Sequence, residues 1–383
     1  YFIQWLRAFD FNKIKDDSNE TIDESNETID ESNETKDDCD EKEINSFMDN
    51  MIQNNIDIRN YYKKHELTDD YLDIITKSFS DNQITNNPHI KCQFVDLLMI
   101  YFEKHVINPY SSIPDKVIYM CQEVAPKLID MLIYTKECLS SGELYDIVLP
   151  QYRLCFLINH LILNNKSRFQ HVFNKLDEPI LLKKLVSIVN SNFEHTFGEA
   201  AIVLKKIGQH QRNPDIEMDD TPESLKRKCQ FYCCSAIEFL FSIKKLTQNF
   251  QRVYMEIEIK DSFINIISSA MESLLGSNRK DFKVTNAKEI GFEPITYLIY
   301  MKDILINLSS EPDFNQSLAK NQRIDYLKYL DMLLSILNMK GYIDVNQESS
   351  INLLKFTLEK EVKILEEKQK KLEEVEDEIP DEF

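Results

Sequence analysis

Cysteine is the residue type in this sequence best suited to metal binding or to nucleophilic chemistry. There are eight: Cys39, Cys92, Cys121, Cys138, Cys155, Cys229, Cys233 and Cys234. None forms a C-x-x-C pair, and no set of Cys and His recurs at the spacing of a zinc site. Cys229 and Cys233 would share one helical face, but two ligands without a second pair do not hold a structural zinc ion. We therefore predict buried structural thiols in a reducing compartment.

Other reactive residues also lack the pattern that catalysis requires. The sequence has no G-x-S-x-G, no G-x-G-x-x-G, no phosphate-binding loop and no H-E-x-x-H. His160 falls on an apolar helix face, where a structural role is expected, and the adjacent Asp219 and Asp220 are expected to be solvated in a polar loop. We predict no catalytic residue, no metal ligand and no cofactor in this chain.

Composition indicates helices. Only 6 Gly and 11 Pro occur in 383 residues, so chain breaks are scarce, and no stretch shows convincing strand alternation.

The net charge of −20 argues against a nucleic-acid partner, which requires a basic face. No run reaches the eighteen or so apolar residues of a membrane span. The longest candidate, residues 154–163, is interrupted by Asn159 and His160. We expect a soluble, all-α protein.

More than half of the negative charge lies in one segment, residues 15–43, which holds 14 acidic residues and 3 lysines. Within it a seven-residue period repeats as SNETIDE at 18–24, SNETIDE at 25–31 and SNETKDD at 32–38. One apolar residue per period cannot build a coiled-coil seam, and so charged a segment has too little apolar surface to offset its ordering entropy. We interpret it as a disordered acidic insertion after residues 1–14, the end of a truncated helix containing Trp5.

Deletion of residues 18–38 is accordingly expected to leave the melting temperature of the chain almost unchanged, because the repeat has nothing to bury. Thermal unfolding of the deleted and full chains, followed by circular dichroism, tests this. A loss of several degrees on deletion would instead show that the repeat packs on the folded part.

Residues 44–376 are predicted to form one helical core. Amphipathic helices are expected at 44–58, 70–79, 87–106, 117–138, 142–163, 179–208, 224–246, 250–275 and 348–376, with a loop at 208–222. The apolar residues of 224–246, Phe231, Phe239, Leu240, Phe241 and Ile243, are too many for one exposed face, so this helix should be central. The last helix carries a stripe of Ile351, Leu354, Leu358, Val362, Leu365 and Leu372, and opposite it the pairs Glu359–Lys363, Glu366–Lys370 and Glu367–Lys371.

The most informative stretch runs from 271 to 309. Gly276 is placed where a helix ends with a left-handed residue, and Pro294 suits the first turn of the next helix. Between them lie 17 residues with isolated apolar side chains, Phe282, Val284, Ile290 and Phe292. So long a connection is unusual in a compact domain and must be held by such residues. We predict Phe282, Gly291, Phe292 and Pro294 as its anchors.

This stretch also carries a resemblance. LLGSNRKDFKVTNAKEIGFEP at 274–294 and DILINLS at 303–309 resemble the late core of the ubiquitin conjugation factors, which lengthen ubiquitin chains. Three further stretches agree in the same order: NPHIKCQFVDLL at 87–98, LYDIVLPQYR at 144–153 continuing to SRFQHVFNKL at 167–176, and IPDEF at 379–383, where the family's U-box begins. The sequence is similar to that family over nearly its whole length, apart from the acidic repeat.

The resemblance implies an elongated, curved, armadillo- or HEAT-like solenoid with a long C-terminal helix. It also implies a ubiquitin-chain-elongating ligase whose U-box recruits a charged ubiquitin-conjugating enzyme. The core would hold ubiquitinated substrates and dock an AAA-type segregase, in a monomer of the cytoplasm and nucleus. Residues 377–383, with Ile379, Pro380, Asp381, Glu382 and Phe383, would be the lead-in to a U-box absent from this chain.

A second interpretation remains open on residues alone: a non-enzymatic helical adaptor for transport or tethering, without a ubiquitin role. The coding sequence after Phe383 separates the two. A U-box there favours the elongation factor, whereas unrelated sequence or a stop codon favours the adaptor.

Overall fold

The computed structural model describes residues 129, 132, 151–152, 154–156, 158–159, 174, 179–214, 220–280, 282–321 and 323–377, with backbone only at 278 and 371–377. The chain divides into two compact units, Tyr1–Lys127 and Leu128–Phe383, and all described residues belong to the second. The helices predicted at 44–58, 70–79 and 87–106, the acidic repeat, His160 and Asp219 lie outside the described residues.

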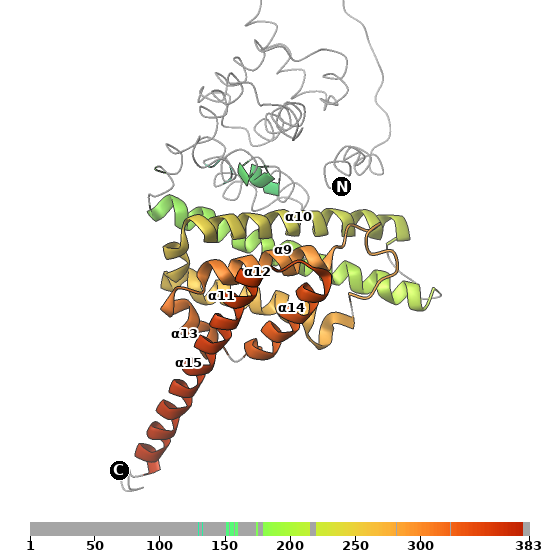
Figure 1. The fold of residues 1–383 in the computed structure, drawn as a ribbon. Helices are drawn as coiled ribbons and strands as arrows, with labels where there is room; N and C mark the ends of the chain where they lie inside the picture. Colours follow the sequence, from blue (N-terminus) through green and yellow to red (C-terminus); the bar gives the residue numbers. More distant parts are fainter. Residues whose placement is uncertain are drawn as a thin grey trace, which may run out of the picture. The chain divides into compact units, whose positions relative to one another are not determined.

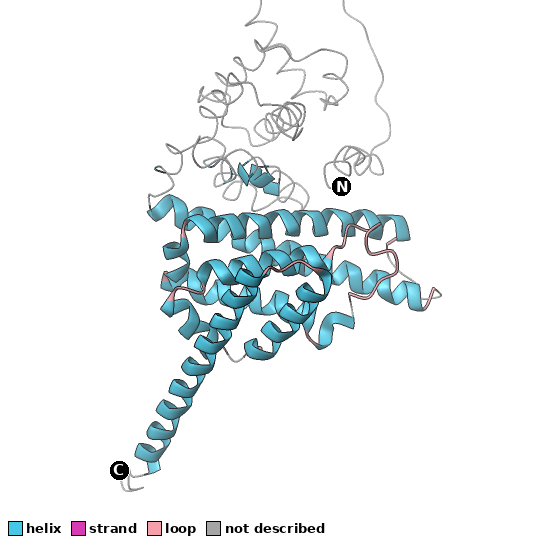
Figure 2. Cartoon of the chain, in the orientation of Figure 1, coloured by secondary structure: helices cyan, strands magenta, loops and turns pink. Residues whose placement is uncertain are grey.

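Within the described residues every regular element is a helix, as Figures 1 and 2 show. The α-helices are α9 (Pro179–Arg212), α10 (Pro222–Asn249), α11 (Ile257–Leu275), α12 (Pro294–Leu308), α13 (Pro312–Lys320), α14 (Tyr326–Lys340) and α15 (Val345–Asp377). Two short 3₁₀ helices, η4 (Gln251–Met255) and η5 (Ser277–Lys280), flank α11. The prediction of an all-α fold is confirmed.

Helix limits follow from local chemistry. At α10 the Thr221 hydroxyl accepts a hydrogen bond from the Ser224 amide at 3.2 Å, and Pro222 occupies the first turn, where its missing N–H leaves no donor unsatisfied. At α14 the Asp325 carboxylate caps the Lys328 amide, and Gly341 ends the helix at φ +72°. Such left-handed backbone is strained for any residue with a Cβ, so glycine suits this position.

Gly276 and Gly208, at which helix ends were predicted, have other roles in the structure. Gly276 ends α11 with φ −81° and ψ −160°, so it is not left-handed. It is required instead by close approach, since a Cβ here would lie 2.5 Å from the Glu272 carbonyl oxygen and 2.6 Å from Tyr329 Oη. Gly208 does not end α9, which continues to Arg212. A Cβ at Gly208 would lie 3.3 Å from the Lys283 carbonyl oxygen, so this glycine makes room for the loop after α11.

Two other expectations are wrong. Residues 250–256 do not begin α11: Phe250 ends α10 with φ −138°, and η4 turns the chain before α11 starts. Asp220 is not simply solvated. Its carboxylate lies 2.5 Å from Lys228 Nζ, which lowers the Asp220 pKa chiefly by hydrogen bonding, and 3.8 Å from Lys206 Nζ. This ion pair ties the start of α10 to α9 because Lys206 lies on α9.

The helices stack on one another around a continuous apolar core. Helix α10 packs along α9 and also against α12, α11 packs on α9, and α13, α14 and α15 pack together (Figure 1). The predicted central position of α10 is confirmed, because Phe231, Phe239, Leu240 and Ile243 are at most 2% exposed. Phe241 is half-buried and its ring lies 5.4 Å from that of Tyr300. This layered arrangement is that of a helical solenoid.

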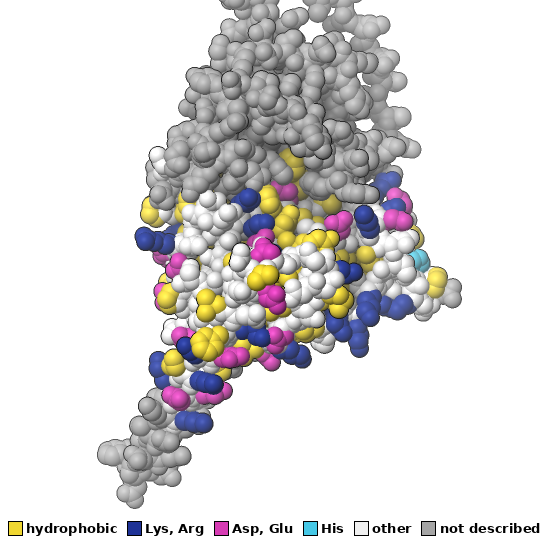
Figure 3. All heavy atoms as spheres, in the orientation of Figure 1, with side chains coloured by type: hydrophobic (Ala, Val, Ile, Leu, Met, Phe, Trp, Pro, Cys, Tyr) yellow, Lys and Arg dark blue, Asp and Glu magenta, His cyan; other side chains and the backbone are white. Residues whose placement is uncertain are grey.

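Helix α15 is packed in its first half only. Ile351, Leu354 and Leu358 are buried, whereas no side chain from 359 to 370 is. Figure 1 shows this second half extending beyond the other helices. The predicted pairs Glu359–Lys363 and Glu366–Lys370 do not reach ion-pair distance in the described structure, since exposed pairs gain too little to fix two long side chains. Lysines and carboxylates are mixed on this face in Figure 3.

Among the helices that the structure describes, none combines the length and the apolar character needed to cross a membrane.

Candidate functional site: the anchored loop and the helix beyond it

The loop between α11 and α12, residues 277–293, is a series of tight turns. Three backbone bonds close its second half: Glu289 N to Asn286 O at 2.8 Å, Gly291 N to Lys288 O at 3.2 Å and Phe292 N to Ala287 O at 2.9 Å. Asn286 has φ 57°, a conformation that asparagine adopts more readily than most residues. The loop therefore has a defined backbone of its own.

Two glutamine side chains hold this loop onto the helices. Gln211 of α9 accepts a hydrogen bond from the Thr285 amide at 2.8 Å and donates one to the Thr285 carbonyl at 3.3 Å. Gln230 of α10 donates to the Glu289 carbonyl at 2.7 Å. An amide side chain can pair with a backbone amide in this way because it carries one donor group and one acceptor. These contacts could not be predicted from the sequence, since glutamines on a helix surface carry no distinguishing pattern.

Gly291 lets the loop come close to α10. Its φ is +76°, and a Cβ there would lie 3.3 Å from the Gln230 Cα. A side chain would be unfavourable on both counts, because it would strain the backbone and press on a helix that cannot move away. Gly291 thus acts on the α10 side of the loop as Gly208 does on the α9 side.

An aromatic cluster lies beneath the loop. The Phe282 ring lies 6.1 Å from that of Phe197 and 5.5 Å from that of Phe292, and the Tyr297 ring lies 5.4 Å from Phe197 and 6.1 Å from Phe292. Tyr297 also donates a hydrogen bond to the Cys233 carbonyl at 2.8 Å. The cluster therefore joins the loop to α9, α10 and α12 by apolar contact and by ring packing.

The structure brings together all four loop residues singled out from the sequence. Phe292 is 4% exposed and Phe282 is half-buried, Gly291 lies against α10, and Pro294 occupies the first turn of α12. The outer surface of the loop is polar, with exposed Lys283, Thr285, Asn286, Lys288, Glu289 and Glu293. Ile379, Pro380, Asp381, Glu382 and Phe383 lie outside the described residues.

The described cysteines are unsuited to nucleophilic chemistry. Cys155, Cys229, Cys233 and Cys234 are free and buried, which confirms the burial predicted for these four. Cys229 Sγ and Cys233 Sγ lie 3.7 Å apart. Burial raises the pKa of Cys155 and Cys234. For Cys233 the hydrogen bond with Cys229 raises the pKa first and burial adds to it, so these thiols stay protonated. No group of three or more potential metal ligands occurs in the described part of the chain.

A buried carboxyl group lies beside them that the sequence analysis missed. Glu238 of α10 is 5% exposed, and Asn159 Nδ2 donates to its Oε1 at 2.5 Å and to Ser242 Oγ at 2.8 Å. Burial raises the pKa of Glu238 to about 7, and the hydrogen bond from Asn159 opposes that rise in part. Glu238 falls on the helix face that carries Cys234 and Phe241, so only its occurrence among apolar neighbours could have indicated burial.

Comparison with known proteins places these features in a family. A sequence model described as "Ubiquitin elongating factor core" matches residues 42–359. The chain belongs to the ubiquitin elongating factor core family. The resemblance inferred from the motifs is therefore confirmed.

Two curated relatives of this ubiquitin elongating factor core are similar along much of the chain. It is 20% identical over 285 residues to "Ubiquitin conjugation factor E4" of Schizosaccharomyces pombe, covering 68% of this chain and 27% of the relative. It is 21% identical over 321 residues to "E4 ubiquitin-protein ligase UFD2" of Saccharomyces cerevisiae, covering 78% of this chain and 32% of the relative. The matches thus span between about a quarter and a third of each relative's length.

The extent of the family match agrees with the packing. It includes all of α9 to α14 and the loop at 277–293, and it ends at residue 359, one position after the last buried residue of α15, Leu358. The packed helices that the structure describes therefore fall within the shared ubiquitin elongating factor core. The second half of α15 lies beyond the matched region.

Proposed function

We propose that this chain is the core of a ubiquitin-chain elongation factor that acts in ubiquitin-dependent protein degradation. The observation that carries this proposal is the family match over residues 42–359, which includes the helical stack and the anchored loop together. One relative is named a conjugation factor and the other a ubiquitin-protein ligase, so the inferred reaction is transfer of ubiquitin onto an existing conjugate.

The core would contribute by positioning. A covalent ubiquitin thioester needs an accessible thiolate, and Cys155, Cys229, Cys233 and Cys234 are buried. Holding a charged conjugating enzyme close to an acceptor lysine accelerates transfer without any covalent step, because the two reactants no longer have to find each other in solution. A rigid stack with a pinned loop suits that task better than a flexible linker does.

We infer the following division of roles. A U-box joined beyond α15 would bind the charged conjugating enzyme, and the stack would bind ubiquitinated substrate and dock an AAA-type segregase, in a monomer working in cytoplasm and nucleus. The part of α15 after Leu358 adds 19 residues of helix, which extend about 28 Å from the stack. Such an arm would set the distance between the conjugating enzyme and the acceptor.

The test is a single-turnover discharge assay with a ubiquitin-loaded conjugating enzyme. Residues 1–383 alone are expected to fold yet not to accelerate discharge. The chain joined to a U-box beyond α15 is expected to discharge the enzyme and to lengthen ubiquitin chains. Equal rates for the two proteins, both active or both silent, would contradict this division of roles.

A control variant separates binding of the conjugating enzyme from its positioning. Glu366→Pro in the extended protein breaks the projecting part of α15, because proline removes a backbone donor and clashes with the preceding turn, but it touches no buried side chain. Discharge should persist, since the U-box is intact, while chain elongation should fall. If elongation is unaffected, the arm does not position the enzyme.

A further inference from the structure

Helix α12 contains a buried lysine that lies apart from the anchored loop. Lys302 is 2% exposed and is the only basic residue buried in the described part of the chain. A buried charge is unfavourable unless it is paired and hydrogen-bonded, so a buried lysine needs fixed partners. Lys302 Nζ lies 3.0 Å from the Asp303 carboxylate and donates a hydrogen bond to Gln347 Oε1 at 2.8 Å. Lys302 therefore joins α12 directly to the first turn of α15.

Gln347 is a fixed point of α15. Its backbone amide donates to the Asp344 carboxylate at 2.9 Å, and the Asp344 amide donates back to Gln347 Oε1 at 3.4 Å. Such a reciprocal pair is a capping box, which satisfies the first amides of a helix and defines where it begins. Because Lys302 donates to the same Oε1 atom, the buried ammonium group holds the well-defined start of α15.

Helix α10 holds this lysine from the other side. Lys244 Nζ of α10 lies 2.7 Å from the second carboxylate oxygen of Asp303 and 5.0 Å from the centre of the Tyr300 ring. Asp303 is 17% exposed and so bridges two lysines with little water around it. A partly buried pair of this kind is screened less by salt than an exposed one. A continuous series of polar contacts thus runs from α10 through α12 to α15.

The length of α15 gives a contact at its start a large effect at its end. Ile351, Leu354 and Leu358 attach α15 to the stack by apolar burial, which is non-directional, whereas a hydrogen bond weakens as its angle departs from linear. Beyond them the projecting half of α15, residues 359–377, shows no buried side chain up to residue 370. A tilt of about 10° at its base would move the end of this projection, about 28 Å long, by about 5 Å.

Two other polar contacts of α15 are exposed. Asn338 Nδ2 donates to Glu348 Oε1 at 3.2 Å, and Lys355 pairs with Asp331 of α14, whose side chain is 63% exposed. Exposed pairs contribute little, because water competes for both partners and two long side chains must be held still. The contact with Lys302 differs from both because its donor is buried.

We propose that Lys302 is a positioning residue that fixes the direction of the projecting half of α15 by holding the first turn of that helix. This direction is a property of the described stack. The consequence for activity, that Lys302 sets the distance over which ubiquitin is transferred, rests on the proposed function.

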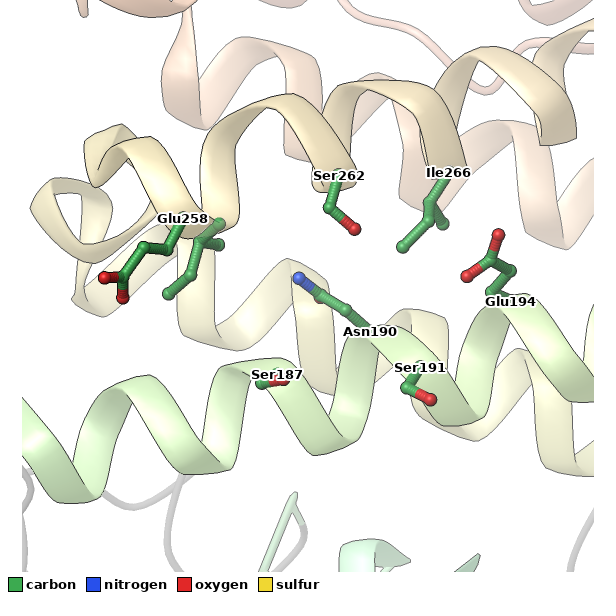
Figure 4. A pocket seen from close by; sticks show the side chains of 8 residues that line it. Ser187, Asn190, Ser191, Glu194, Glu258, Ser262 and Ile266 are labelled. Carbon is green, nitrogen blue, oxygen red and sulfur yellow. The ribbon is translucent and has the colours of Figure 1, made fainter.

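Pulsed electron paramagnetic resonance on the 383-residue chain measures this direction. One nitroxide, carried by a non-natural residue so that the cysteines stay unlabelled, replaces the exposed Lys370 of α15. The other replaces Ser262, which Figure 4 shows at the pocket of about 250 Å³ between α9 and α11, and no residue of α15 lines that pocket. Lys302→Met should broaden the distance distribution at least about twofold, because methionine keeps the apolar stem and lacks the donor.

Stability separates positioning from a general structural role. Lys302→Met leaves Asp303 paired with Lys244, and apolar side chains of similar volume often replace buried ion pairs without loss, so the melting temperature should not fall. Gln347→Met should broaden the distribution equally. The double variant should be no broader than either single variant, since both substitutions remove one contact. Gln347 is only half-buried, so this variant keeps the proposal testable if Lys302→Met fails to fold.

Lys355→Met is the matched control, because it removes a lysine that joins α15 to the exposed Asp331. It should broaden the distribution by less than about 1.2-fold. An unchanged width in Lys302→Met, a lower melting temperature without broadening, or equal broadening in Lys355→Met would overturn the proposal.

The protein joined to a U-box tests the consequence for activity. Lys302→Met should lower chain elongation at least about threefold while discharge of the conjugating enzyme persists, because only the placement of the reactants has changed. Unchanged elongation despite a broader distribution would contradict the link to transfer. If the parent lengthens no chains, the proposed function fails, and the distance measurement still decides the role of Lys302.

Discussion

Phe292→Ala is expected to lower the free energy of unfolding by about 3 kcal/mol, within the range for truncating a buried aromatic side chain. Phe292 is 4% exposed, and its ring packs between those of Phe282 and Tyr297. Its loss would leave a cavity beneath the loop and remove the apolar contact that holds the loop against α12. Urea unfolding of the variant and the parent, with an unchanged dependence on denaturant, gives this difference directly.

The matched control is Phe356→Ala, which removes the same ring from α15, where it is 52% exposed. That substitution should cost less than about 1 kcal/mol because little buried area is lost. If Phe292→Ala melts like the parent, Phe292 is accessible in solution and belongs to a partner surface. Equal losses from both substitutions would show that burial does not determine the effect.

Much of the loop was predictable because the relevant signals are local. Pro294 fixes a helix start by its own ring, and isolated apolar residues such as Phe292 in a polar segment must find a buried site. The contacts of Gln211 and Gln230 were not predictable, since they join residues 74 and 59 positions apart and glutamine is common on helix surfaces. Which helices receive the loop is a tertiary fact that no local pattern encodes.

The roles of the glycines likewise depend on tertiary contacts that local sequence does not reveal. The position of Gly276 predicts a left-handed conformation, but Gly341 at the end of α14 is the glycine that adopts one after a helix. Gly276 and Gly208 are needed because other atoms come close to them, and a close neighbour cannot be read from the residue itself. The end signals of α13 and α14 were present in the sequence, since Pro312 starts α13, Asp325 caps α14 and Gly341 ends it, yet neither helix was predicted.

The buried carboxyl group of Glu238 was missed for a related reason. Glutamate is common in helices, and only contact with Asn159, 79 residues earlier, shows that this one is enclosed. Its place beside Cys155 and Ser242 puts an ionisable group among buried side chains. Because burial raises the pKa of Glu238, the free energy of unfolding is expected to depend on pH.

The stability of the fold is expected to fall as pH rises from about 4.5 to about 7, because Glu238 keeps its proton in the folded chain after the unfolded chain has lost it. Burial raises the pKa of Glu238 from 4.5 to about 7. The unfolded state therefore binds fewer protons across this interval, and linkage makes the loss roughly 3 kcal/mol by pH 7. Below pH 4.5 both states are protonated and the contribution is fully present, whereas above pH 7 both are charged and the loss is constant.

Glu238→Gln removes the titrating group while keeping its shape, so the difference in unfolding free energy between variant and parent isolates this effect from the other carboxyl groups. The variant should gain up to about 3 kcal/mol on the parent between pH 4.5 and pH 8. Urea unfolding at several pH values measures the difference, with Glu199→Gln as the control for a change in net charge. A difference that does not vary with pH would mean that Glu238 titrates as an exposed carboxyl, and that the layer around Asn159 is open to water.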